Sequence, residues 1–86
     1  MNILVSNLSL HVFDSDLRKL FAAFGNVIAA GILRDKGNGR SQGAAFVHMA
    51  NNHQATQAVF CLNRTVVDGK RISVNEIKNI LGQHMN

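Results

Sequence analysis

The chain has 86 residues, 47% of them hydrophobic, a formal net charge of +4 and one cysteine, Cys61. This length corresponds to one domain, and the hydrophobic content excludes a disordered chain. One cysteine forms no disulfide within the chain, and no apolar run approaches the ~20 residues of a membrane helix, so we expect a cytoplasmic protein without membrane association. The excess of basic residues favours a nucleic-acid partner.

A strand and a helix are the first predicted elements. The apolar run Ile3-Leu4-Val5 stops at Ser6-Asn7, as a strand does. Asp14-Ser15-Asp16 are residue types that cap helix N-termini, and apolar residues then recur at helical spacing, at Leu17, Leu20, Phe21 and Phe24. Gly25 stands where a C-terminal cap belongs, so we expect the helix to end there.

Two further strands are predicted in the middle of the chain, at residues 27–33 and 44–49. The loop between them, residues 34–43, holds three glycines and four charged residues. A glycine-rich phosphate cradle opens a helix, whereas this loop opens a strand, so we interpret it as an inter-strand loop.

The last part of the chain predicts a helix, a hairpin and a strand. Asn51-Asn52 can cap a second helix, which carries a shared face of Ala55, Val59 and Leu62. Asp68-Gly69 is a hairpin turn that joins Val66-Val67 to the next residues, and residues 72–75 alternate as a final strand. The order β-α-β-β-α-β predicts an α+β, ferredoxin-like fold, in which one face of a four-stranded antiparallel sheet carries both helices.

Two short segments resemble the signature motifs of the RNA recognition motif (RRM) family. Residues 3–8 resemble its hexamer motif, and residues 42–49 resemble its octamer motif. The resemblance extends over residues 1–78 and is nearest in appearance to small stand-alone members of bacterial type. We therefore expect an RRM-like domain at 1–78 and a C-terminal tail at 79–86. In that tail, apolar spacing predicts a short helix that packs at the sheet edge or over the sheet, with a frayed end as the alternative.

The resemblance implies binding of single-stranded RNA on the sheet face that the helices leave free, with base stacking at Leu4, Ala44 and Phe46. Only Phe46 of these is aromatic. Strand alternation independently predicts this open face, which we define as Leu4, Ser6, Ala29, Gly31, Leu33, Ala44, Phe46, His48, Ser73 and Asn75. The expected RNA contacts are Leu4, Ser6, Leu33, Arg34, Lys36, Arg40, Gln42, Ala44, Phe46, His48, Lys70, Arg71, Ser73 and Asn75.

Two other classes of function have less support. A protein–protein interaction module on the same scaffold is favoured by the two missing rings and by Phe60, which lies off the apolar stripe of the second helix and suggests a weak homodimer. An enzyme is not expected, because no nucleophile elbow is present and the loop at 6–13 lacks the arginine of acylphosphatases, which share the element order. No metal or cofactor is expected, since no zinc-like spacing relates His11, His48, His53, His84 and Cys61.

Overall fold

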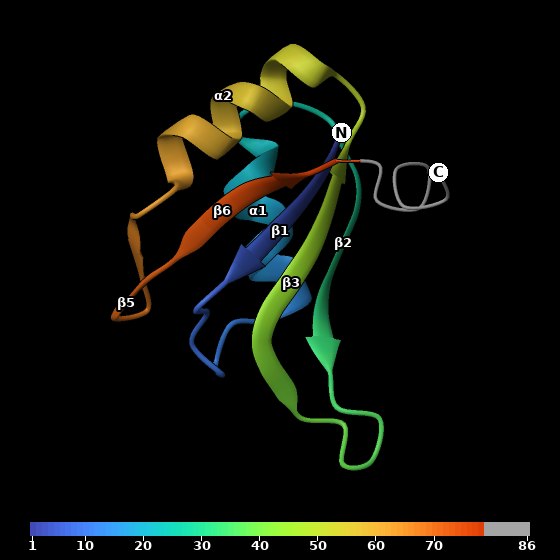
Figure 1. Ribbon diagram of the computed structural model, residues 1–86, viewed down its shortest axis with the longest axis vertical. Helices are drawn as coiled ribbons and strands as arrows, with labels where there is room; N and C mark the ends of the chain where they lie inside the picture. Colours follow the sequence, from blue (N-terminus) through green and yellow to red (C-terminus); the bar gives the residue numbers. More distant parts are fainter. Residues whose placement is uncertain (79–86) are drawn as a thin grey trace.

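The computed structural model describes residues 1–78, which fold into a sheet layer and a helix layer (Figure 1). The sheet has the order β2-β3-β1-β6 with antiparallel pairing throughout, and β4 and β5 form a separate hairpin. This confirms the predicted ferredoxin-like fold, while the expected tail helix lies outside the described residues. The elements are β1 (Asn2–Ser6), α1 (Asp14–Ala22), β2 (Val27–Arg34), β3 (Ser41–Met49), α2 (Asn52–Leu62), β4 (Val66–Val67), β5 (Lys70–Arg71) and β6 (Ser73–Ile77).

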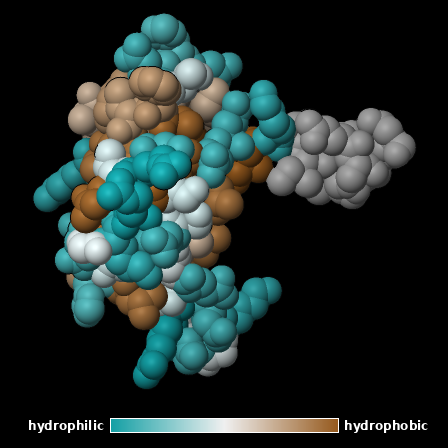
Figure 2. All heavy atoms as spheres, turned by 60° about the vertical axis from the view of Figure 1, so that its left-hand side comes forward, coloured by the Kyte–Doolittle hydropathy of each residue, from teal (hydrophilic) through white to brown (hydrophobic). Residues whose placement is uncertain are grey.

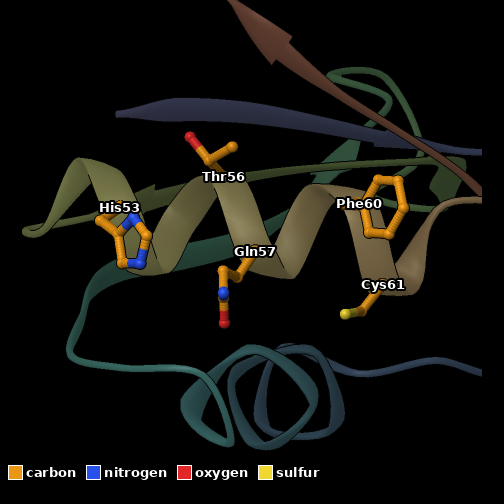
Figure 3. Close-up of a pocket in the computed structure, with 5 residues that line it drawn as sticks. All are labelled: His53, Thr56, Gln57, Phe60 and Cys61. Atoms are coloured by element: carbon orange, nitrogen blue, oxygen red, sulfur yellow. The ribbon is translucent and has the colours of Figure 1, made fainter.

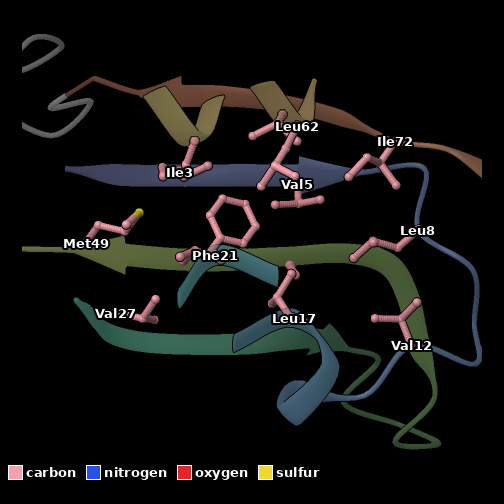
Figure 4. Packing of buried hydrophobic residues seen from close by; sticks show 14 of the residues in the cluster. Ile3, Val5, Leu8, Val12, Leu17, Phe21, Val27, Met49, Leu62 and Ile72 are labelled. Carbon is pink, nitrogen blue, oxygen red and sulfur yellow. The ribbon is translucent and has the colours of Figure 1, made fainter. Parts of the chain in front are cut away.

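The hydrophobic core lies between the sheet and the helices (Figure 4). Alternate residues of the strands point into it, and Leu17 and Phe21 of α1 meet them from the other layer. Helix α2 contributes Ala55, Ala58 and Leu62, while Val59 of the predicted stripe is only partly buried. The sheet contributes Ile3, Val5, Val27, Ile32, Ala45, Val47, Met49 and Val74.

Both ends of α1 differ from their predictions. The N-cap is Phe13, one residue before the predicted Asp14-Ser15-Asp16 cap, and the carboxylate of Asp16 accepts a hydrogen bond from the Phe13 N–H at 3.0 Å. The helix ends at Ala22. Gly25 is no cap: a Cβ atom there would lie 2.9 Å from the Cβ of Gln54, so glycine allows this turn to approach α2.

Asp14 connects the start of α1 to the edge strand β2. Its carboxylate accepts a hydrogen bond from the Ile32 N–H at 2.9 Å. We expect Asp14→Ala to lower the free energy of unfolding by about 0.5–1.5 kcal/mol, because the amide of Ile32 loses this partner. Urea denaturation measures the change, with Ser15→Ala in the same exposed turn as the control. Equal stability of the two variants would show that the bond contributes nothing.

The elements after β3 follow their predictions closely. Asn51 is the N-cap of α2, and its side chain accepts a hydrogen bond from the Gln54 N–H at 2.9 Å. Asp68 and Gly69 have φ angles of 50° and 82°, which a two-residue hairpin turn of the tightest type requires at both positions. The turn therefore sets Lys70 and Arg71 at the end of a short, fixed projection (Figure 1).

Candidate nucleic-acid interface

The central row of the open face crosses all four strands. In the pairing register, Phe46 of β3 lies between Gly31 of β2 and Leu4 of β1, and Leu4 pairs in turn with Asn75 of β6. Side chains directly opposite on antiparallel strands share one face. One phenyl ring, one leucine and one amide therefore stand side by side across the sheet.

Phe46 points away from the core, as the alternation predicted. Its neighbours Ala45 and Val47 are completely buried, whereas Phe46 is only partly buried and Leu4 is 37% exposed. On the other side of the ring, a Cβ atom at Gly31 would meet nothing within 4 Å. The glycine thus leaves free space beside Phe46, into which a flat group can enter.

Two further rows flank the central one. Ser6 pairs with Ala44 and with Ser73, so one end of the open face carries two hydroxyl groups and one methyl group, all on small residues. At the other end, Asn2 pairs with His48 and with Ile77. Asn2 and Ile77 are additions to the predicted open face, and the same alternation, extended by two residues from Leu4 and from Asn75, reaches both.

The imidazole of His48 is held in place by the first residue of the chain. Its Nδ1 lies 3.2 Å from the carbonyl oxygen of Met1, and the Met1 amino group donates a hydrogen bond to the Met49 carbonyl at 2.8 Å. His48 is partly buried. Its other ring nitrogen thus remains the one that is available to a ligand.

The β2–β3 loop and the β4–β5 hairpin, which both carry basic residues, lie on two sides of the same end of the sheet (Figure 1). The β2–β3 loop carries Lys36 and Arg40 beyond Arg34, the last residue of β2, and all three residues are exposed. The hairpin carries the exposed Lys70 and Arg71 on the β6 side. We call these five residues the basic rim. The rim borders the Ser6 row, so its charge is concentrated at one end of the open face.

The β2–β3 loop has a defined shape because of Asp35. Its Oδ1 accepts hydrogen bonds from the N–H groups of Gly37 at 2.7 Å and Asn38 at 3.1 Å. Its backbone N–H donates to the Arg40 carbonyl at 2.8 Å, which closes the loop. The Asp35 carboxylate thus stabilises the conformation of the loop, and this conformation positions Lys36 and Arg40.

Gly43 explains why Gln42 lies apart from the open face. Gly43 has a φ of +74°, and the register shifts between Ile32 and Arg34 opposite it, so β3 bulges here. The Gly43 carbonyl accepts a hydrogen bond from the Leu8 N–H at 2.9 Å, and a Cβ atom at Gly43 would lie 3.3 Å from the Leu8 carbonyl oxygen. The bulge leaves Gln42 exposed beside the basic rim.

The sequence-predicted contacts therefore fall into three groups. The structure brings together Leu4, Ser6, Ala44, Phe46, His48, Ser73 and Asn75 on the sheet. It sets the basic rim at one end, with Gln42 next to the bulge. Leu33 is 40% exposed on the edge strand, at the irregular end of the β2–β3 pairing.

A serine, a histidine and an aspartate lie close together near the hairpin, but their hydrogen bonds differ from those of a catalytic triad. The hydroxyl of Ser9 donates to the Asp68 carboxylate, and the Nδ1 of His11 lies 3.5 Å from that hydroxyl and 3.8 Å from Asp68. A catalytic serine gives its proton to histidine, whereas Ser9 is buried and gives it directly to the carboxylate. These contacts join the β1–α1 loop to the hairpin.

Within residues 1–78, no three His, Cys, Asp or Glu side chains come together in a way that could hold a metal ion. No helix in this part of the chain is long and apolar enough to cross a membrane.

The sequence is similar to one known protein family and to several of its members. The sequence model of the RNA recognition motif matches residues 3–73. A Sex-lethal homolog of Musca domestica is 38% identical over 68 residues, which are 79% of this chain and 21% of that protein. Glycine-rich RNA-binding protein 1 of Mycosarcoma maydis is 36% identical over 73 residues, 85% of this chain and 42% of that protein. The chain thus spans less than half the length of these relatives, and the expected likeness to bacterial members stays a prediction.

Solved structures agree with the sequence relatives. The crystal structure of RNA Binding Protein PG1 superimposes with a TM-score of 0.87 at 35% identity, covering 90% of this chain and 93% of that one. A structure described as an Sxl-lethal protein/RNA complex gives a TM-score of 0.82 at 33% identity, covering 88% of this chain and 47% of that one. The sequence motifs, the sheet order and these comparisons agree, and the chain belongs to the RNA recognition motif family.

Proposed function

We propose that the chain binds single-stranded RNA on the open face of its sheet. The observation that carries the proposal is the central row, in which a partly exposed phenyl ring stands between the free space at Gly31 and the side chain of Leu4. Both helices pack on the opposite face. The names of the relatives, a glycine-rich RNA-binding protein and a complex with RNA, support the same ligand.

Each part of the surface has a distinct role in this proposal. A base stacks on Phe46, since every base offers a flat π-face. The Asn75 amide and the hydroxyls of Ser6 and Ser73 reach base edges or sugars, because they can both donate and accept hydrogen bonds. The basic rim contacts phosphates.

Binding is expected to be weak and of low sequence specificity. Leu4 and Ala44 occupy the two positions at which the resemblance implies stacking rings, so among residues 1–78 Phe46 is the only phenyl ring on the open face. Each base–aromatic stack contributes about 1–3 kcal/mol. A surface with one ring therefore depends on its charge for much of its affinity, and charge attracts all RNA sequences alike.

We expect the affinity to depend strongly on salt. For single-stranded nucleic acid, the logarithm of the association constant falls with the logarithm of the salt concentration by about 0.7 per phosphate contacted. If every residue of the basic rim contacts a phosphate, the slope is about −3.5. Fluorescence anisotropy with a labelled unstructured RNA measures it, and the double variant Lys70→Gln/Arg71→Gln should flatten the slope by about 1.4. An unchanged slope in this variant would show that the hairpin does not contact RNA phosphates.

The experiment that tests the proposal is a ¹H–¹⁵N NMR titration with a short unstructured RNA at low salt. Shift changes at Leu4, Ala44, Phe46 and Asn75 are expected, because these residues lie on the open face. No change along β3 would contradict RNA binding and would favour the alternative, a protein–protein interaction module. The absence of catalysis and a cytoplasmic location stay predictions from the sequence.

A further inference from the structure

The outward side of α2 carries a second stripe of residues, distinct from the buried one. His53, Thr56, Gln57 and Phe60 follow each other at helical spacing, and with Cys61 they line a shallow depression of about 460 Å³ (Figure 3). All five residues are exposed. The depression is therefore formed by α2 side chains on the layer opposite to the open face.

Phe60 is the most exposed large apolar side chain of the described chain, at 85%. Figure 2 turns the left-hand side of Figure 1 forward and shows a patch of light-brown, apolar atoms at the height of α2, with further brown atoms lower down. An aromatic ring this exposed gains hydrophobic free energy when another surface covers it. Packing within the domain therefore does not explain why a phenylalanine occupies this position of α2.

Charge restricts what can cover this stripe. Helix α2 contains no Asp, Glu, Lys or Arg, although the chain as a whole has a net charge of +4. A nucleic acid or an acidic peptide would be drawn to the basic rim instead. Two copies of a basic protein repel each other least through an uncharged surface, and α2 provides one.

We propose that two copies of this chain pair through their α2 helices, packed antiparallel about a two-fold axis between Thr56 and Gln57. This axis sets Phe60 opposite the partner's His53, because the two residues are equally far from its centre. Each ring then fills the depression of the other copy, so a single patch complements itself, as a two-fold interface requires. The inference does not depend on RNA binding.

The pairing is weak because the stripe is short. An 11-residue helix is about 16 Å long, and one of its faces offers much less than the roughly 800 Å² per partner of a standard interface. Cys61 does not link the copies. It lies between four and five residues from the axis, which separates the two Cys61 Cα atoms by about 13 Å along the helices, beyond the ~7 Å limit of a disulfide.

Sedimentation equilibrium between about 20 µM and about 1 mM tests the proposal under reducing conditions. The wild-type mass should rise with concentration, Phe60→Glu should stay monomeric, and Phe13→Glu should behave as wild type. Phe13 is the matched control, since it is 63% exposed and lies outside α2. A monomeric wild type, or a Phe60→Glu variant that associates like wild type, overturns the proposal.

A cross-link reports the geometry directly. In a Cys61→Ser background, Gln57→Cys places one thiol beside the axis of each copy, so mild oxidation should give a covalent dimer. Ser15→Cys, exposed on α1, is the control and should cross-link at least tenfold more slowly. Equal rates for the two variants would overturn the antiparallel arrangement. Far-UV circular dichroism verifies that each variant is folded.

Discussion

Phe46→Ala is expected to weaken binding of single-stranded RNA more than any other alanine substitution on the open face. The variant loses the one phenyl ring on that surface, and a base–aromatic stack contributes about 1–3 kcal/mol, so the affinity should fall roughly 5- to 150-fold. Isothermal titration calorimetry or fluorescence anisotropy at low salt measures the loss. The effect should be the same for different bases, since stacking is tolerant of sequence.

Two matched variants separate the ring from its bulk. Phe46→Tyr keeps the aromatic face and should retain the affinity, whereas Phe46→Leu keeps apolar volume without a π-face and should lose it. Thermal melting verifies the fold, which is expected to persist because Phe46 points away from the core. If Phe46→Leu binds RNA as tightly as wild type, stacking on this ring plays no part.

Ala44→Phe should strengthen RNA binding. Ala44 lies across β1 from Ser73, with the small Ser6 between them, so this row of the open face has room for a second ring. A new stack contributes about 1–3 kcal/mol, which is again roughly 5- to 150-fold in affinity.

The control is the same substitution on the other layer. Ala22 is exposed at the end of α1, and Ala22→Phe should leave the affinity unchanged. An Ala44→Phe variant that folds normally and binds no better than Ala22→Phe would show that RNA does not run along β3. Together with Phe46→Ala, this result decides whether the path of the bases follows the third strand.

The sequence predicted the sheet well because period-2 alternation has one consistent solution. Once Ile3 and Val5 face the helices, Leu4 must face away, and the pairing register then sets it beside Phe46. The Asp68-Gly69 turn was equally predictable, since few residue pairs adopt positive φ at two successive positions.

The errors arose where tertiary contacts decide the local structure. Gly25 looks like a helix cap in sequence, but it serves the close approach of Gln54, a residue 29 positions later in the printed sequence. The predicted strand at 44–49 begins three residues later than β3, which starts at Ser41. The difference arises because the bulge at Gly43 depends on the contact with Leu8. Spacing along one segment carries no information about such partners.

The position of β1 has a consequence for synthesis of the protein. This first strand lies in the interior of the sheet, where it pairs with β6, the last strand of the described chain. During synthesis on the ribosome, the edge of β1 that pairs with β6 therefore stays unpaired until residues 73–77 have left the exit tunnel. Such long-range pairing slows folding, and until it occurs one edge of β1 presents unpaired backbone N–H and C=O groups to chaperones.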